Sequence, residues 1–315
     1  MDRLVKEKKN ILVTGATGFI GKNLIKKLKE SNVHIIIVVR NEEKAKKLGD
    51  LSDITIITCE FEKIESLSTK LQQLDIISIE SVIHLAWEGN SGCSRGDDMV
   101  QLKNIQATSR LIREVEKLGC KKFIGIGTVS ENLVMESEIR GVSTNMVYAA
   151  AKLSCYYMAR VLCKEKKIDF VWCRLANVYG PGNETGNLMS YTLKSLLEYQ
   201  KPTYSSAQVW QDFIFIDDCI EALMRIVFSN NKRDLYYIGT GQPKKLKEYL
   251  MIVRDIVSPN IELGIGERPD DGLIYKKEWF DIRGMQEEYD YCPRVTFEEG
   301  IKRTIVMEDK RNEEI

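Results

Sequence analysis

Over its first 178 residues the chain alternates short runs of β-branched residues with longer stretches whose apolar residues recur at helical spacing. This alternation is typical of a parallel sheet whose strands are joined by crossover helices. We expect strands at residues 10–14, 34–39, 54–57, 81–85, 122–126 and 170–173. The connecting helices are expected at residues 19–30, 41–48, 63–72, 100–118 and 147–166. The sequence therefore predicts an α/β fold with a doubly wound parallel sheet.

A glycine-rich loop lies between the first predicted strand and the first predicted helix, with the sequence Thr14-Gly-Ala-Thr-Gly-Phe-Ile-Gly21. In this context Gly15 permits a tight turn, Gly18 lets the backbone approach a pyrophosphate, and Gly21 lets the helix pack closely on the strand. The helix N-terminus adds N–H groups and partial positive charge for the phosphates. The pattern predicts a Rossmann-type dinucleotide site formed by Gly15, Thr17, Gly18, Phe19, Ile20 and Gly21.

The residue after the second predicted strand bears on the choice of dinucleotide. An NAD site usually has an acidic residue there for the ribose 2′-hydroxyl, whereas this chain has Arg40. An arginine offers a cation and a planar face to a 2′-phosphate, which favours NADP(H) and leaves NAD possible. Arg40 could also be only a solvated strand end. Further cofactor contacts are expected after the third and fourth strands, at Glu60, Phe61, Leu85 and Ala86.

A tyrosine and a lysine, Tyr148 and Lys152, stand four residues apart at the start of a predicted helix. This spacing places them on one face, where the lysine ammonium favours the phenolate and lowers the pKa of the tyrosine. The tyrosine could then exchange a proton with a substrate hydroxyl or carbonyl. Thr128, at the end of the fifth predicted strand, could hydrogen-bond the reacting oxygen. Such a pair is often only a surface pair, but the glycine loop and Thr128 favour a catalytic role for Tyr148, Lys152 and Thr128.

The strict alternation stops after residue 178, where a turn-rich stretch begins. We expect a dinucleotide-binding domain at residues 1–178 and a smaller substrate-binding lobe at residues 179–315. Residues 209–230 resemble one more strand and helix, and they are expected to return to the larger domain.

Charge and residue usage exclude several kinds of partner. The 46 lysines and arginines balance the 46 aspartates and glutamates without a basic block, so nucleic acid is not expected. No apolar run reaches the roughly 20 residues of a membrane span, and we expect a cytoplasmic protein without a membrane partner. The eight cysteines form no Cys-x-x-Cys pair and are expected to be reduced, and two separated histidines make a metal site improbable.

Motifs spread along the chain accompany the glycine loop and the Tyr148/Lys152 pair. They are Asn104, Arg174-Leu-Ala-Asn-Val-Tyr-Gly-Pro-Gly182, Gly186-Asn-Leu188, Gln211-Asp-Phe-Ile-Phe-Ile-Asp-Asp218, Glu267-Arg-Pro-Asp-Asp271 and Cys292-Pro-Arg-Val-Thr-Phe-Glu-Glu-Gly300. Over nearly its whole length the chain resembles the extended short-chain dehydrogenase/reductase family of nucleotide-sugar epimerases, dehydratases and reductases. The resemblance implies that Asn177, Asn187 and Arg268 hold the pyrophosphate of a nucleotide sugar. It also implies that Asn104 helps to order the active-site helix.

Two departures concern the substrate. Gln211 stands where the family often has arginine, and Trp87 opens a long loop, residues 87–95, that is expected to shape the sugar pocket. Trp87 could equally be a plain core tryptophan. The expected substrate contacts are Trp87, Thr128, Ser130, Asn177, Asn187, Leu188, Gln211 and Arg268.

Dehydratases of this family usually carry an Asp-Glu pair after the catalytic threonine, but here Val129-Ser130 follows, which disfavours a 4,6-dehydratase. Arg40 favours NADPH-dependent reduction of a nucleotide-linked 4-keto-sugar. The alternatives are an NAD-retaining nucleotide-sugar 4-epimerase and, in a different class, a dinucleotide-binding sensor without turnover.

The resemblance also implies a homodimer that pairs helices 100–118 and 147–166 with their copies. Both helices carry more apolar residues than one buried stripe requires. They are Leu111, Ile112 and Val115 on the first helix and Tyr156, Tyr157, Met158, Val161 and Leu162 on the second.

Overall fold

The computed structural model describes residues 8–46, 48–136, 143 and 145–313. Within this part of the chain, a seven-stranded parallel sheet has the order β11-β6-β5-β4-β1-β2-β3. Its strands are β1 (Lys9–Thr14), β2 (Val33–Val39), β3 (Ile54–Thr58), β4 (Ser81–His84), β5 (Lys122–Thr128), β6 (Asp169–Leu175) and β11 (Leu235–Ile238). The predicted α/β fold with a doubly wound, Rossmann-type sheet is therefore confirmed.

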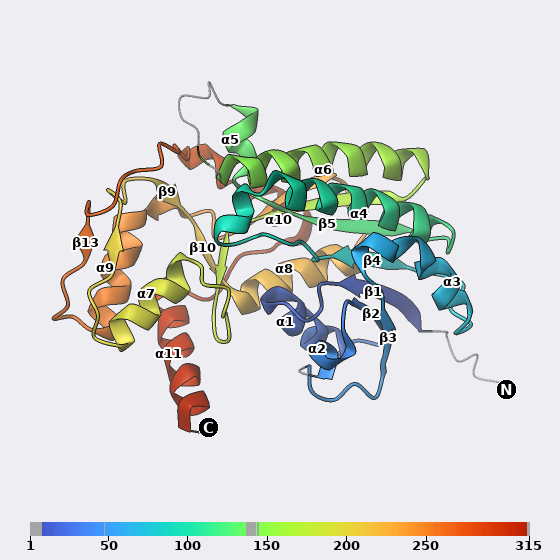
Figure 1. Cartoon of the computed structure of the whole chain (residues 1–315), viewed down its shortest axis with the longest axis horizontal. Helices are drawn as coiled ribbons and strands as arrows, with labels where there is room; N and C mark the ends of the chain where they lie inside the picture. Colours follow the sequence, from blue (N-terminus) through green and yellow to red (C-terminus); the bar gives the residue numbers. More distant parts are fainter. Residues whose placement is uncertain (1–7, 47, 137–142, 144, 314–315) are drawn as a thin grey trace.

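Helices cover both faces of this sheet (Figure 1). One face packs on α1 (Phe19–Leu28) and α8 (Ile216–Phe228), and the other packs on α3 (Leu67–Gln72), α4 (Asp98–Glu116) and α6 (Asn145–Glu165). Successive side chains of a strand point to opposite faces. In β1, Ile11 and Val13 accordingly join the core on the α1 side, whereas Leu12 joins the core on the α4 side.

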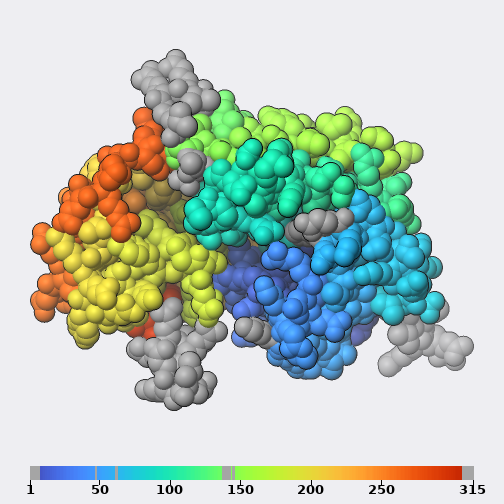
Figure 2. Space-filling view, viewed as in Figure 1, coloured from blue at the N-terminus to red at the C-terminus, as the bar shows by residue number. Residues whose placement is uncertain are grey.

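The remaining elements lie mainly in the second half of the chain. Those that precede residue 150 are α2 (Glu42–Lys46), η1 (Phe61–Ser66), η2 (Cys93–Gly96) and α5 (Glu131–Met135). Those that follow are β7 (Asn177–Tyr179), α7 (Leu188–Leu197), β8 (Thr203–Tyr204), β9 (Trp210–Gln211), β10 (Phe213–Phe215), β12 (Lys244–Lys245), α9 (Leu246–Val257), β13 (Gly264–Ile265), η3 (Lys277–Trp279), α10 (Arg283–Tyr289) and α11 (Phe297–Glu313). In the space-filling view, the yellow and orange residues of this second half adjoin the blue and green residues along a seam (Figure 2).

The path of the chain after β6 differs from the sequence expectation in two ways. β10 pairs with β7 in a separate two-stranded sheet, and only α8, which packs beside α1, returns to the large sheet in residues 209–230. β11 then adds a seventh strand that was not expected, because Leu235-Tyr-Tyr-Ile238 has one β-branched residue and lies after residue 178, where the strict alternation stops. The division into a domain at 1–178 and a lobe at 179–315 stays a prediction.

All eight cysteines are free thiols, and six of them are buried. Burial raises the pKa of Cys120 and of Cys219 to about 12, so these thiols stay protonated at neutral pH. Among the described residues, none of the helices combines the length and the apolar character that a membrane span requires. The cytoplasmic location stays a prediction.

Candidate active site

The glycine loop lies between β1 and α1, and its glycines fit the close approaches there. Gly15 has a φ of +72°, and a Cβ atom on it would lie 2.6 Å from the backbone nitrogen of Ala86. A Cβ on Gly21 would collide with the backbone of Gly15 and Ala16. Gly18 is the N-cap of α1, and because glycine has no side chain, no side chain caps this helix. The first turn of α1 also has no acidic residue. The uncapped N–H groups and the absence of a Cβ fit the pyrophosphate of a dinucleotide.

A cavity of about 360 Å³ lies beside this loop, at the carboxyl edge of the sheet. It brings together side chains and backbone from both halves of the chain. The sequence-predicted residues that line it are Gly15, Gly18, Phe19, Ile20, Gly21, Leu85, Trp87, Thr128, Ser130, Tyr148, Lys152, Asn177, Asn187 and Gln211.

Several predicted site residues do not line this cavity. Thr17, Ala86 and Leu188 are absent from its wall. Arg268 is also absent, and it donates hydrogen bonds to Thr203 Oγ1 at 2.7 Å and to the Tyr191 hydroxyl at 3.0 Å. These two acceptors hold the guanidinium between α7 and β8. The expectation that Arg268 holds the pyrophosphate of a nucleotide sugar stays a prediction.

Arg40 and Glu60 line a second cavity, of about 340 Å³, together with Glu88, Lys103 and Arg110. A nitrogen of the Arg40 guanidinium lies 3.4 Å from a carboxylate oxygen of Glu88, and both side chains are exposed. The Phe61 side chain lies outside the described part of the structure.

Tyr148 and Lys152 are buried together in the first turns of α6. Lys152 Nζ donates a hydrogen bond to the Ile126 carbonyl at 2.6 Å and lies 3.7 Å from the ring centroid of Trp87. The same nitrogen is 6.0 Å from the ring centroid of Tyr148. The pair is therefore brought together, but the ammonium faces Trp87 more closely than it faces the phenol.

The titration of this pair differs from the sequence expectation. Burial lowers the pKa of Lys152 to about 8 and raises the pKa of Tyr148 to about 12. The expectation that Lys152 lowers the pKa of Tyr148 is not met in this structure, because desolvation of the phenol dominates. Tyr148 is consequently a neutral phenol at pH 7.

The backbone N–H of Thr128 is hydrogen-bonded to the buried carboxylate of Glu131. Glu131 Oε1 accepts from the Thr128 backbone N–H at 2.9 Å, and Glu131 Oε2 accepts from Arg174 Nε at 2.7 Å. The indole N–H of Trp172 donates to the same carboxylate at 3.0 Å. Glu131 is fully buried and does not line the cavity, so its negative charge is paired with Arg174 and is not presented to a ligand.

The loop between β4 and α4 is fastened to α4 by two amide side chains. The Trp87 indole N–H donates to Gln101 Oε1 at 2.8 Å, and Gln101 Nε2 donates to the Gly89 carbonyl at 2.8 Å. Asn104 exchanges two hydrogen bonds with the backbone of Glu88. The resemblance implied that Asn104 helps to order the active-site helix. In this structure its side chain instead orders the loop between β4 and α4.

Sequence reasoning missed several residues that line the cavity, namely Asn90, Ser91, Arg95, Asn183, Thr185 and Tyr275. Arg95 ends the loop that was expected to shape the sugar pocket, but nothing in the sequence distinguishes it from a solvated loop charge. Tyr275 approaches from a distant segment, and its hydroxyl lies 2.9 Å from Ser130 Oγ.

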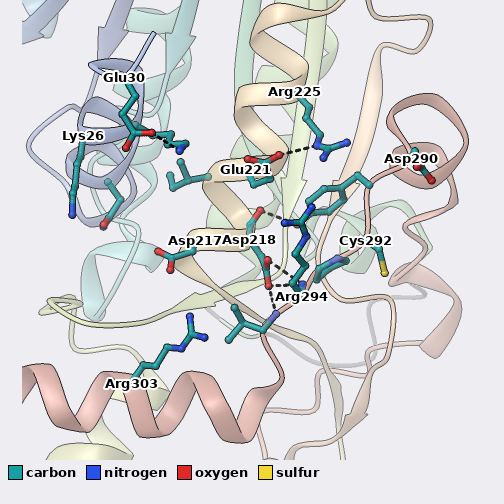
Figure 3. Close-up of a pocket in the computed structure, with 16 residues that line it drawn as sticks. Lys26, Glu30, Asp217, Asp218, Glu221, Arg225, Asp290, Cys292, Arg294 and Arg303 are labelled. Atoms are coloured by element: carbon teal, nitrogen blue, oxygen red, sulfur yellow. Dashed lines mark hydrogen bonds and ion pairs between the residues drawn. The ribbon is translucent and has the colours of Figure 1, made fainter.

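The larger cavity of Figure 3, about 890 Å³, is separate from this site and lies between α1, α8 and α11. Some of its charged side chains are paired within the protein. Arg225 pairs with Glu221, and the Asp218 carboxylate accepts backbone N–H groups of Arg294 and Val295. These contacts tie residues 294–295 to α8.

Comparison with known proteins agrees with this geometry. The model of the NAD dependent epimerase/dehydratase family matches residues 11–239. CDP-abequose synthase of Salmonella typhimurium is 25% identical over 312 residues, covering 94% of this chain and 98% of that protein. dTDP-4-dehydro-6-deoxyglucose reductase of Escherichia coli is 25% identical over 314 residues, covering 95% and 97%.

A solved UDP-glucose 4-epimerase of Thermotoga maritima, with UDP-glucose, has the same fold. It superposes with a TM-score of 0.81 at 21% identity and covers 96% of this chain and 99% of its own. The family match spans most of the chain and includes the glycine loop, Thr128, Tyr148 and Lys152. The chain is therefore an enzyme that belongs to the NAD dependent epimerase/dehydratase family.

Proposed function

We propose that this enzyme catalyses NADPH-dependent reduction of a nucleotide-linked 4-keto-sugar, with Tyr148 as the proton donor. Among the curated relatives, one is named as a reductase of a dTDP-linked 4-dehydro-6-deoxy sugar. The known epimerase has the same fold, so fold alone does not decide between the two reactions. The observation that carries the choice of reduction is Arg40, a cation after β2 that is suited to the 2′-phosphate of NADPH.

The cavity wall argues against a third reaction of the family, the elimination of water. Among the described residues, no aspartate or glutamate lines it, and its charged side chains are Lys152 and Arg95. Elimination of water from a sugar needs an acid and a base, and Glu131 is occupied by Arg174 and Trp172. The phenol of Tyr148, held neutral by burial, is suited to donate a proton to a carbonyl oxygen.

The proposed roles follow from these positions. The Tyr148 hydroxyl donates its proton to the oxygen of the keto group, and the Thr128 hydroxyl donates a hydrogen bond to the same oxygen. Lys152 is expected to contact the ribose next to the nicotinamide. A nicotinamide cofactor, when bound at the glycine loop, supplies the hydride. Asn177, Asn187 and Gln211 also line the cavity and are proposed to bind the nucleotide-sugar pyrophosphate.

The proposal is tested by incubating the purified protein with a panel of nucleotide-linked 4-keto-sugars and nucleotide sugars. Oxidation of NADPH or NADH is followed by its absorbance, and the products are identified by mass spectrometry. We expect NADPH-dependent loss of a 4-keto-sugar and gain of two hydrogens in the product. Interconversion of 4-epimers without net cofactor consumption would instead establish the epimerase.

One observation favours that second function, an NAD-retaining 4-epimerase. Arg40 is paired with Glu88, a carboxylate that would repel a 2′-phosphate. If Glu88 accepts a hydrogen bond from the ribose hydroxyls instead, the pocket favours NAD. The two functions therefore make opposite predictions for Arg40.

The Arg40→Asp variant is expected to shift preference from NADPH toward NADH. The change removes a cation that can pair with the 2′-phosphate and adds a second carboxylate beside Glu88. Charged hydrogen bonds contribute about 1.5–3 kcal/mol, so the ratio of kcat/KM for NADPH to that for NADH should fall about 10- to 100-fold. Glu88→Gln is the matched control, since it should raise the same ratio. An unchanged ratio in Arg40→Asp would assign Arg40 to a solvated strand end and favour the epimerase.

We further propose a homodimer that pairs α4 and α6 with their copies. The choice of α4 residues for this surface was wrong, because Leu111, Ile112 and Val115 are buried in the core of the same chain. On α6, Tyr156 is also buried, but Tyr157, Met158 and Val161 are exposed, as are Met99 and Leu102 near the start of α4. α4 lies at the surface in Figure 2. Exposed apolar residues on adjacent helices favour a partner surface.

Light scattering at micromolar concentration is expected to give about twice the chain mass of 36.1 kDa. Replacing exposed Val161 with glutamate should reduce this mass toward that of one chain, because the charge would be buried in the interface. A wild-type mass near 36.1 kDa would contradict the dimer.

A further inference from the structure

An arginine that sequence reasoning did not single out lies against the face of Tyr148. The Cζ atom of Arg95 is 4.4 Å from the ring centroid of Tyr148, whereas Lys152 Nζ is 6.0 Å from it. Arg95 also lines the catalytic cavity. Its Nε is buried and has no hydrogen-bond partner among the described residues. The guanidinium is therefore the cation nearest to the phenol ring, and the protein itself leaves its buried N–H unpaired.

The loop that carries Arg95 is built to hold it there. Gln101 on α4 donates to the carbonyls of Gly89 and Ser94, on both sides of a turn. Gly89 has a φ of +68°, and a Cβ on it would lie 2.7 Å from the Ser94 carbonyl oxygen. Residues 93–96 then form the short helix η2, which packs against α6 and carries Arg95. An unpaired buried donor costs free energy, so a fixed loop that presents one favours a role in the site.

The charged and titratable groups around Tyr148 come from four elements. Arg95 approaches from η2 and Lys152 from the same helix, α6. Glu131 on α5 and Tyr275, which precedes η3, oppose ionisation of the phenol. Among the described residues, Arg95 is thus the group whose charge acts most directly in favour of a phenolate at position 148.

We propose that Arg95 stabilises the phenolate that Tyr148 becomes when it gives its proton to the substrate, and thereby sets the pH range of the reaction. The inference rests on the proposed function, because it assumes that Tyr148 exchanges this proton. In the reductive direction the O–H bond of Tyr148 breaks and an O–H bond forms on the former carbonyl oxygen. The hydride that reduces the carbon comes from a reduced nicotinamide cofactor. The negative charge left on the phenol then faces the guanidinium of Arg95.

Removing the cation should make the phenolate harder to form. A cation over an aromatic ring interacts more strongly when it is shielded from water, and here Tyr148 and the Nε atom of Arg95 are buried, whereas the Arg95 side chain as a whole is part-buried. We expect Arg95→Gln to raise the pKa of Tyr148 by about one unit, which is about a tenfold change in the phenolate population at a given pH. Arg95→Lys keeps the charge on a shorter, non-planar group and should give an intermediate shift.

The first experiment measures the titration midpoint of the phenol at position 148 directly and needs no substrate. The protein is labelled with 3-fluorotyrosine, whose phenol is more acidic than that of tyrosine, and is titrated by ¹⁹F NMR. The resonance of residue 148 is identified by its absence in Tyr148→Phe. We expect its midpoint to rise in the order wild type, Arg95→Lys, Arg95→Gln. Arg113→Gln, which removes an exposed positive charge on α4, should titrate as wild type.

The second experiment compares pH profiles of kcat/KM in the oxidative direction, where Tyr148 must accept a proton. At each pH below the pKa of Tyr148, kcat/KM should be about tenfold lower in Arg95→Gln than in wild type and unchanged in Arg113→Gln, because the phenolate population falls by that factor. Coincident titration midpoints of wild type and Arg95→Gln would overturn the inference even if the enzyme reduces keto-sugars. A shifted midpoint in a protein that turns over no nucleotide sugar would instead overturn only the proposed function.

Discussion

Replacing Tyr148 with phenylalanine is expected to lower kcat by about 10²- to 10⁴-fold, the range typical of a lost general acid. The phenylalanine ring can keep the edge-on contact with Trp87, whose centroid lies 6.3 Å away, and the contact with Arg95. The variant therefore loses the transferable proton without losing the packing of α6. Cofactor affinity, measured by fluorescence titration, should stay within a few-fold of wild type.

A second tyrosine on the same helix supplies the control for this experiment. Tyr157 is half exposed and packs against Tyr156, away from the cavity. Tyr157→Phe removes the same hydroxyl and should retain kcat. If Tyr148→Phe keeps more than about a tenth of the wild-type kcat, Tyr148 is not the proton donor.

Replacing Arg174 with methionine is expected to destabilise the folded enzyme by about 3–5 kcal/mol, because it leaves the Glu131 carboxylate buried without its ionic partner. Glu131 is 0% exposed and Arg174 is 7% exposed, so neither charge is compensated by water. The lost contacts are the 2.7 Å ion pair and the hydrogen bond from Arg174 to Asn132 Oδ1 at 3.1 Å. The change is measured as the shift in the midpoint and free energy of urea-induced unfolding.

A double variant separates the ion pair from the packing of these side chains. In Glu131→Gln/Arg174→Met both charges are absent, and the glutamine amide can still accept the hydrogen bonds from Thr128 and Trp172. The double variant should therefore be more stable than Arg174→Met alone. Equal stability of the two variants would assign the loss to the volume of the arginine side chain.

The parts of the fold that the sequence predicted are those with local patterns. The strands before residue 178 could be located because each is a short β-branched run followed by an amphipathic helix. β11 was not predicted because it has one β-branched residue and lies outside the regular alternation, and its place in the sheet depends on pairing with β6. Residues 209–230 were expected to return to the larger domain as a strand and a helix, but β10 pairs with β7 in a separate two-stranded sheet, and local sequence does not specify that partner.

The same distinction holds for the site. The glycine loop and the Tyr148/Lys152 pair have fixed spacings, and the structure places both on one cavity. Arg95 and Tyr275 reach that cavity from segments far apart in the chain, so spacing carries no information about them. Arg268, which only the family resemblance singled out, hydrogen-bonds Thr203 and Tyr191 outside the wall of this cavity, and its role in substrate binding stays a prediction.

The distribution of free thiols makes this chain suited to site-specific spectroscopy. Only Cys93 and Cys292 are exposed among the eight cysteines. Cys93 lies in η2, two residues before Arg95, whereas Cys292 lies beside the cavity of Figure 3. A Cys292→Ser background would leave Cys93 as the one exposed thiol, so a fluorophore could be attached there without changing a buried residue. Its emission would then report how the loop over Tyr148 responds when cofactor and sugar bind.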